Sequence, residues 1–195
     1  MRKANVVFLL ILVISTLLTG CFDSTTKVNR LSDYEKKRET PYYWAITDVL
    51  PEINELPEYI NIEYQYRHTR TGPVFQAETM RLVVVYDKGT YENEKIKLGE
   101  KSFLDSAVPK LMVDGSHSVY YLIPEVEFSI GSYNFRVLAG EGFLYPHNIG
   151  FIATSDKKNS VAYLYFYDQD LDIISKDNKK GSMEKFIKNY FEYDW

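Results

Sequence analysis

Cys21 is the residue in this sequence whose surroundings indicate chemistry most directly. It is the only cysteine among 195 residues, and it follows Leu18-Thr19-Gly20, in which Thr19 and Gly20 are small enough to pass through a narrow protease site. A cysteine thiolate is a strong nucleophile and can be alkylated. Because a lone cysteine has no intramolecular disulfide partner, its presence in an exported chain needs another explanation. Alkylation of the thiol supplies one.

The residues before Cys21 have the composition of an export signal. Arg2 and Lys3 form a basic start, and an unbroken apolar run covers residues 6–14. A basic, then apolar, then small-residue order is typical of a secretory signal peptide. The run is also shorter than the roughly 20 apolar residues that a membrane-spanning helix needs. Together with the four residues that end at Cys21, this segment resembles the signal peptide and lipobox of bacterial lipoproteins.

In that family the cysteine thiol receives a diacylglyceryl group, a signal peptidase cuts just before the cysteine, and the new amine is often acylated. The resemblance therefore implies cleavage between Gly20 and Cys21 and a covalent lipid on Cys21, with no other cofactor. Two or three acyl chains hold firmly, because each buried CH₂ contributes roughly 0.8 kcal/mol. Phe22 stands where Asp is associated with inner-membrane retention. The resemblance thus implies the outer membrane, facing the periplasm, in a Gram-negative host, and the outer face of the cell membrane in a Gram-positive one.

The histidines and aspartates do not form a metal or catalytic pattern. The three histidines, His68, His117 and His147, are far apart, and none has a metal-ligand spacing to another. Aspartates at positions 168, 170 and 172 are spaced like the opening of a calcium loop, but the places that need Gly and Glu hold Ile173 and Lys179. We therefore predict no metal site and no catalytic residue, and favour a protein that is not an enzyme.

Two segments are candidates for binding a partner. Arg67, His68 and Arg70 form a basic cluster that could bind an acidic partner; the favoured alternative is that the cluster and Arg81 pair with Glu63 and Glu78 across strands. The second segment, residues 140–148, has glycines, aromatic residues and a histidine, and we assign Tyr145 and His147 to it as contact residues. A loop that bridges two hairpins explains this segment without a function.

Composition excludes one class of partner. Removal of Arg2 and Lys3 lowers the 23 basic residues to 21, against 27 acidic ones, so the mature chain has a net charge of −6. With no basic surplus for phosphate contacts, nucleic acid is excluded as the expected partner. The 17 Tyr and 11 Phe residues favour a pleated, half-buried surface. The aromatic content therefore predicts a sheet.

Period-two alternation predicts where the strands lie. It predicts an antiparallel pair over residues 60–68 and 77–86, and a hairpin of residues 126–130 and 133–137 with Gly131-Ser132 as a type II′ turn. A second hairpin joins residues 151–154 to 161–167. In the last strand both faces are apolar or aromatic, which predicts a central position in the sheet.

Helices are predicted at the two ends of the mature chain. Ser32 is placed as the cap of a short helix, Pro41 as the start of another, and Ser182 as the cap of a C-terminal helix whose Phe186 and Tyr190 share a stripe. We predict a signal peptide over 1–20, a flexible tether over 21–31 and one globular domain over 32–195. The fold class is α+β, a mostly antiparallel β-sheet with an N-terminal helical segment and a C-terminal helix packed on it.

These observations favour a membrane-anchored envelope lipoprotein that binds another envelope or secreted protein, one version being an inhibitor or immunity protein. The alternative is a lipoprotein that binds a small ligand or glycan in a tyrosine-lined cleft of the sheet. Exposed tyrosines on one sheet face would favour the alternative, and a covered face would remove it.

We expect Cys21→Ala to produce a precursor that is unlipidated, uncleaved or mis-sorted, because the thiol that accepts the lipid is gone. Incorporation of radiolabelled palmitate into wild type and variant measures this. Equal labelling of both chains would contradict the lipid anchor.

Overall fold

The protein is built on a seven-stranded antiparallel sheet with helices on both faces, which confirms the predicted α+β fold. The computed structural model describes residues 24–39, 46–71, 75–105, 109–114, 117–123, 125–140, 142–143, 147–169 and 182–195. The strands are β1 Ser24–Val28, β2 Asn61–Thr71, β3 Phe75–Val85, β4 Pro109–Asp114, β5 His117–Leu122, β6 Glu127–Ile130, β7 Tyr133–Val137, β8 Asn148–Ser155 and β9 Ser160–Asp168. The helices are η1 Leu31–Asp33, α2 Tyr34–Arg38, α3 Ile46–Val49, η2 Ile53–Glu55, α4 Lys88–Gly99 and α5 Met183–Tyr190.

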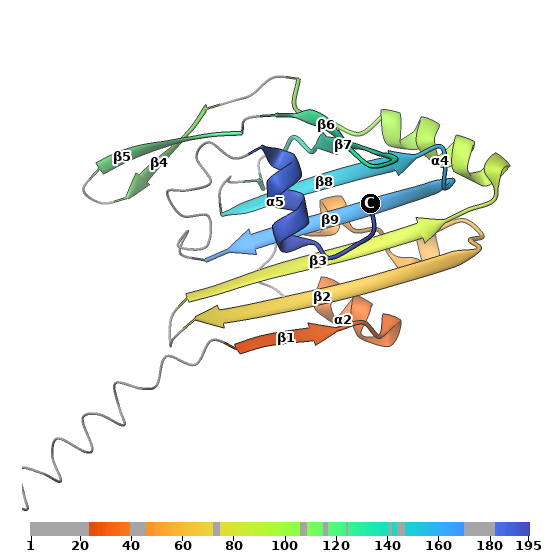
Figure 1. Ribbon diagram of the computed structural model, residues 1–195, viewed down its shortest axis with the longest axis horizontal. Coiled ribbons are helices and arrows are strands. Elements are labelled where there is room, and N and C mark those ends of the chain that lie inside the picture. Colours follow the sequence, from red (N-terminus) through yellow and green to blue (C-terminus); the bar gives the residue numbers. More distant parts are fainter. Residues whose placement is uncertain are drawn as a thin grey trace, which may run out of the picture.

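Strand β9 lies at the centre of the sheet, whose order is β1-β2-β3-β9-β8-β7-β6 (Figure 1). Ala162, Leu164 and Phe166 point to one face and are fully buried. The residues between them, among them Tyr163 and Tyr165, are buried in a second core on the other face. The predicted central position of this strand is therefore confirmed, and its pairing with β8 gives the predicted hairpin.

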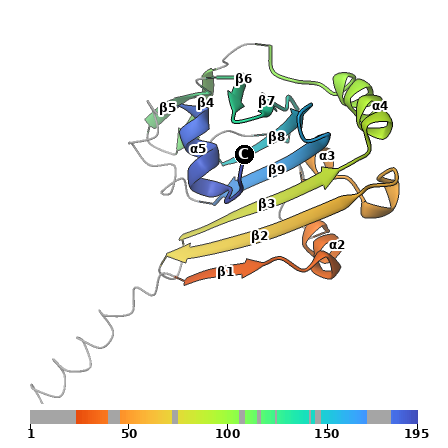
Figure 2. The ribbon, with the colours of Figure 1, turned by 45° about the vertical axis from the view of Figure 1, so that its right-hand side comes forward.

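Each core lies under its own set of helices. Helices α2, α3 and α4 cover one face, which we call the α4 face, where tyrosines such as Tyr64 and Tyr66 pack against Tyr34 and Leu98. Helix α5 crosses the opposite face, the α5 face, and buries Phe186 there (Figure 2). None of the helices in the described part of the chain has the length and apolar character needed to cross a membrane.

The β6–β7 hairpin turns at Gly131-Ser132, as predicted. Gly131 has a φ of +57°, and the only described non-glycine residue with positive φ is Asn159. Positive φ at the first central residue alone is the mark of a type II′ turn. Gly131 is also held by packing, because a Cβ there would lie 2.1 Å from the carbonyl oxygen of Trp195. The absence of a side chain at Gly131 thus allows Trp195 to pack against the turn.

Helix α5 begins as the sequence predicts, with the Ser182 hydroxyl accepting a hydrogen bond from the Lys185 N–H at 3.3 Å. The predicted short helix after Ser32 is also present, as η1 followed by α2, but no side chain caps either of them. The predicted helix start at Pro41 lies outside the described residues.

Two predictions are wrong in part. Residues 24–28 belong to the predicted tether, yet they form β1, which pairs with β2 along its whole length. A polar edge strand is solvated, so its composition does not distinguish it from a linker. By composition, Asp87-Lys88-Gly89 predicts a turn, yet the segment starts α4, because the Asp87 carboxylate accepts hydrogen bonds from the N–H groups of Gly89 and Thr90.

We expect Gly131→Ala to lower the free energy of unfolding by about 1–3 kcal/mol, since it adds both left-handed strain and a clash with the chain terminus. Gly99→Ala is the matched control: a Cβ there meets nothing within 4 Å, and the residue ends a helix. Urea unfolding of both variants measures the difference. Equal stability of the two variants would contradict the role given to the turn.

Candidate functional site

The predicted basic cluster is divided between the two faces of the sheet. Side chains alternate along β2, so Arg67 lies on the α5 face, whereas His68 and Arg70 lie on the α4 face beyond Tyr66. Arg67 and His68, which are adjacent in sequence, thus lie on opposite faces of the sheet. The three residues do not form one basic patch.

The predicted cross-strand pairing holds for one member of the cluster. His68 faces Glu78 in register, and its Nε2 lies 3.9 Å from the Glu78 carboxylate. Arg81 instead faces Gln65 and lies beneath the Tyr193 ring, with its guanidinium carbon 4.5 Å from the ring centroid. The carboxylate of Glu63 is near enough to favour the charged form of Arg81, while burial lowers the pKa of its guanidinium.

The second predicted surface is only partly described. His147 precedes β8, and its Nδ1 lies 2.9 Å from the backbone oxygen of Asp168, so the ring helps to close the β8–β9 pair. Tyr145, Gly20 and Cys21 lie outside the described residues. His117 lies in β5, which pairs with β4 in a separate two-stranded sheet. No group of three metal-ligating side chains occurs among the residues that the structure describes.

The registers bring the two predicted surfaces to one end of the sheet. Asp168, hydrogen-bonded to His147, pairs with Ala77, which pairs with Thr69. Arg70 in the next row pairs with Ser24, the first residue of β1. We call this the anchor end, because Ser24 follows by three residues the cysteine, Cys21, that the sequence predicts to carry a lipid.

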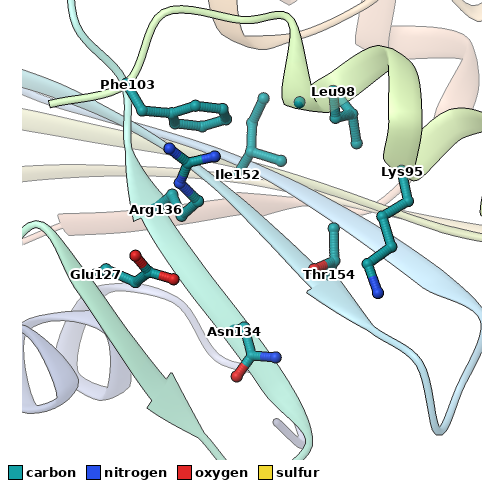
Figure 3. Close-up of a pocket in the computed structure, with 9 residues that line it drawn as sticks. Lys95, Leu98, Phe103, Glu127, Asn134, Arg136, Ile152 and Thr154 are labelled. Atoms are coloured by element: carbon teal, nitrogen blue, oxygen red, sulfur yellow. The ribbon is translucent and has the colours of Figure 1, made fainter. Parts of the chain in front are cut away.

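A groove lies elsewhere, between α4 and the strands β6, β7 and β8. This α4 groove has a volume of about 300 Å³. Its lining residues come from four elements and the segment after α4: Lys95, Leu98, Gly99, Phe103, Glu127, Asn134, Arg136, Ile152 and Thr154 (Figure 3). Most of the polar side chains belong to strands, which hold them in fixed positions.

Strand alternation places these polar groups on the α4 face. In β7, Tyr133, Phe135 and Val137 are buried in the core under α5. Asn134 and Arg136 must therefore point to the other face. The core on that face, under α2, α3 and α4, takes its strand residues from β2, β3, β8 and β9 and, in the described part of the chain, none from β6 or β7. Strands β6 and β7 are left as the polar floor of the groove.

Arg136 and Glu127 form the charged centre of the groove. They face each other across β6 and β7, and the Arg136 guanidinium lies under the Phe103 ring at 3.8 Å from its centroid (Figure 3). A cation over an aromatic face is stabilised while its N–H edges remain available. Neither residue makes an ion pair within 4.0 Å in the described part of the chain. The groove therefore presents an unpaired cation and an unpaired carboxylate side by side.

Lys95 at the mouth of the groove is held by a neighbour. Its Nζ donates to the carboxylate of Asp156 at 2.6 Å, and the Tyr91 hydroxyl donates to the same oxygen. These two hydrogen bonds lower the pKa of Asp156. Burial and the same carboxylate raise the pKa of Tyr91, so the hydroxyl stays protonated.

Sequence reasoning missed the α4 groove. A signal for it exists in the hairpin, where Glu127, Asn134 and Arg136 are polar positions between buried aromatic ones. That pattern is common to any strand with one solvated face. Only the position of α4 converts part of this solvated face into a groove.

Comparisons of the chain with protein-family models, curated proteins and solved structures find no match.

Asp87 is fully exposed, and its hydrogen bonds to Thr90 and Gly89 hold its pKa below the ordinary value of 3.8. A lowered folded-state pKa contributes stability above the ordinary value, which is lost as the pH falls through the folded value. We therefore expect Asp87→Ala to be less stable than wild type at neutral pH, with the gap closing below pH 3.8. Urea midpoints across this range measure it. A gap that does not change with pH would contradict capping by the ionised carboxylate.

Proposed function

We propose that this protein is a bacterial envelope lipoprotein, anchored to the membrane by lipid on Cys21, that acts as a non-enzymatic module and binds another envelope or secreted protein through the α4 groove. The observation that carries the proposal is that Arg136 and Glu127, neighbours across β6 and β7, make no ion pair in the described part of the chain and face an open groove instead of the core. In one version of the proposal, the protein is an inhibitor or immunity protein, and the bound partner is a secreted protein that it inactivates.

The place of β1 supports this choice of surface. Ser24 is the third residue after Cys21, and three residue steps span at most about 11 Å, so a lipid on Cys21 would hold the anchor end of the sheet close to the bilayer. Arg70 and His147 lie at that end. Thr154, in the groove, is six residues farther along β8 than Asn148, or about 20 Å away at the rise of a strand. The groove is the more accessible surface to a protein in the periplasm or outside the cell.

The groove chemistry indicates what kind of segment it would take. Arg136 offers N–H donors that suit a carboxylate, and Glu127 offers an acceptor for a basic or amide group. Leu98, Ile152 and the Phe103 ring provide apolar contact on the side of Arg136 away from Glu127 (Figure 3). A peptide segment that carries an acidic and a basic side chain matches these three properties.

A small ligand is the second candidate, because about 300 Å³ is at the lower limit of pockets that hold small molecules. The tyrosine-lined cleft that the sequence suggested is not its site. Four tyrosines of the α4 face, Tyr64, Tyr66, Tyr163 and Tyr165, are at most 5% exposed and belong to the core, and Tyr167 is partly buried against it.

The test is co-purification of the full chain from detergent-solubilised envelopes, followed by mass spectrometry. We expect Arg136→Ala and Glu127→Gln to lose a protein that wild type retains, because each removes one charge of the groove. Arg70→Gln, an exposed change at the anchor end, is the matched control and should retain it.

Loss of the protein on Arg70→Gln or Tyr145→Ala, with Arg136→Ala unaffected, would place binding at the anchor end and contradict the groove. A small molecule found by native mass spectrometry on wild type and absent from Arg136→Ala would favour the second candidate.

A further inference from the structure

The α5 face has its own open region, over β1 and β2, and this region is cationic together with the buried Arg81 of β3 beside it. Helix α5 crosses β8 and β9 and leaves β1 and β2 open (Figure 1). Lys27, Arg67 and Arg81 lie on this face, one on each strand. Glu63 is the one carboxylate that these strands place beside them, and the C-terminal segment adds Glu192. The region thus has one more positive charge than negative.

The C-terminal segment satisfies part of this charge. Glu192 accepts hydrogen bonds from Lys27 Nζ through both carboxylate oxygens at 2.8 Å, and it lies 3.6 Å from the nearest Arg67 nitrogen. Tyr193, the next residue, lies over the Arg81 guanidinium. Lys27 is therefore fully engaged by Glu192, whereas Arg67 shares that carboxylate at a longer distance.

Buried donors on the two arginines have no partner. The Nε of Arg67 and the Nε and Nη1 of Arg81 are shielded from solvent and donate to no described group. Arg81 as a whole is 6% exposed. Donors on charged groups that are buried without an acceptor cost free energy, and native structures rarely leave them so. An acceptor from outside the chain would remove this cost.

A small cavity adjoins Arg67 on the side away from Arg81. It is lined by Arg67, Thr69, Ala77, Thr79 and Tyr190 and has a volume of about 70 Å³. Thr69 and Thr79 sit on adjacent strands, and neither hydroxyl makes a side-chain hydrogen bond to a described residue. The space equals that of about two water molecules, at roughly 30 Å³ each in the liquid. It suits a small anion better than an organic ligand.

We propose that this cavity, the Arg67 pocket, binds a small oxyanion of the phosphate type. A guanidinium and two hydroxyl groups supply donors from three side chains, which matches an anion with three or more acceptor oxygens better than a carboxylate with two. The surplus positive charge of the region supplies the electrostatic attraction.

The place of the pocket allows two sources for such an anion. Thr69 pairs with Thr25, the second residue of β1, so the pocket borders the anchor end of the sheet. A phospholipid headgroup could reach it in a protein anchored at Cys21, and so could free phosphate. The oxyanion is the chemistry that both share.

The test is thermal unfolding of the full chain in detergent at constant ionic strength, with inorganic phosphate, acetate or chloride as the added anion. Binding to the folded state raises the midpoint with saturation. We expect phosphate to do so and acetate to do so at least about tenfold more weakly, given the difference in donor contacts. Arg67→Gln should abolish the phosphate effect and Thr79→Val should weaken it. Lys88→Gln, the same kind of change at an exposed residue of α4 on the other face of the sheet, should keep it.

Thr79→Val preserves shape and keeps the test decisive where Arg67→Gln fails to fold. No saturable shift with phosphate, or the same shift in Thr79→Val as in wild type, would overturn the proposal. A further titration compares inorganic phosphate with glycerophosphoglycerol, the headgroup of phosphatidylglycerol. Tighter binding of the diester supports a lipid source, tighter binding of phosphate supports the free ion, and binding of neither overturns the site.

Discussion

The burial of β9 on both faces is the constraint on which the rest of the structure depends. Its seven residues from Ser160 to Phe166 are all at most 3% exposed, so every second side chain must be covered from the opposite side. Antiparallel neighbours satisfy its backbone groups. Coverage of its two faces requires two separate sets of helices, and those sets form the two cores. A single helical layer would leave one row of aromatic side chains in water, at a cost of roughly 25 cal/mol for each Å² exposed.

The helices are too few to cover seven strands on both faces, and the uncovered areas are where the candidate sites lie. On the α4 face the outer strands β6 and β7 are left open, and on the α5 face the open strands are β1 and β2 at the opposite edge. Side chains in both areas are polar, since an apolar surface there would be exposed. The α4 groove and the Arg67 pocket each lie where a helix borders such an area.

The C-terminal segment, residues 191–195, contacts both edges of the α5 face. Trp195 packs on Tyr133 and Phe135 of β7, and its carbonyl oxygen occupies the space beside Gly131. Three residues earlier, Glu192 reaches Lys27 of β1, and the hydrogen bonds from Lys27 keep the pKa of Glu192 below its ordinary value. The segment therefore spans from β7 to β1 across the α5 face. It closes that core and sets the charge around the Arg67 pocket.

The β2–β3, β6–β7 and β8–β9 hairpins, the turn at Gly131-Ser132, the central strand and the C-terminal helix follow from the sequence alone, because period-two and period-3.6 patterns and turn chemistry are local properties. The motif at Cys21, on which the proposed lipid anchor rests, is likewise local. Which polar residues meet depends on the tertiary structure. Arg67 and His68 are neighbours in sequence and lie on opposite faces, whereas Glu192 and Lys27 are 165 residues apart and form an ion pair. Strand alternation separates the first pair and chain topology joins the second, and neither the groove nor the pocket exists until α4 and α5 pack on the sheet.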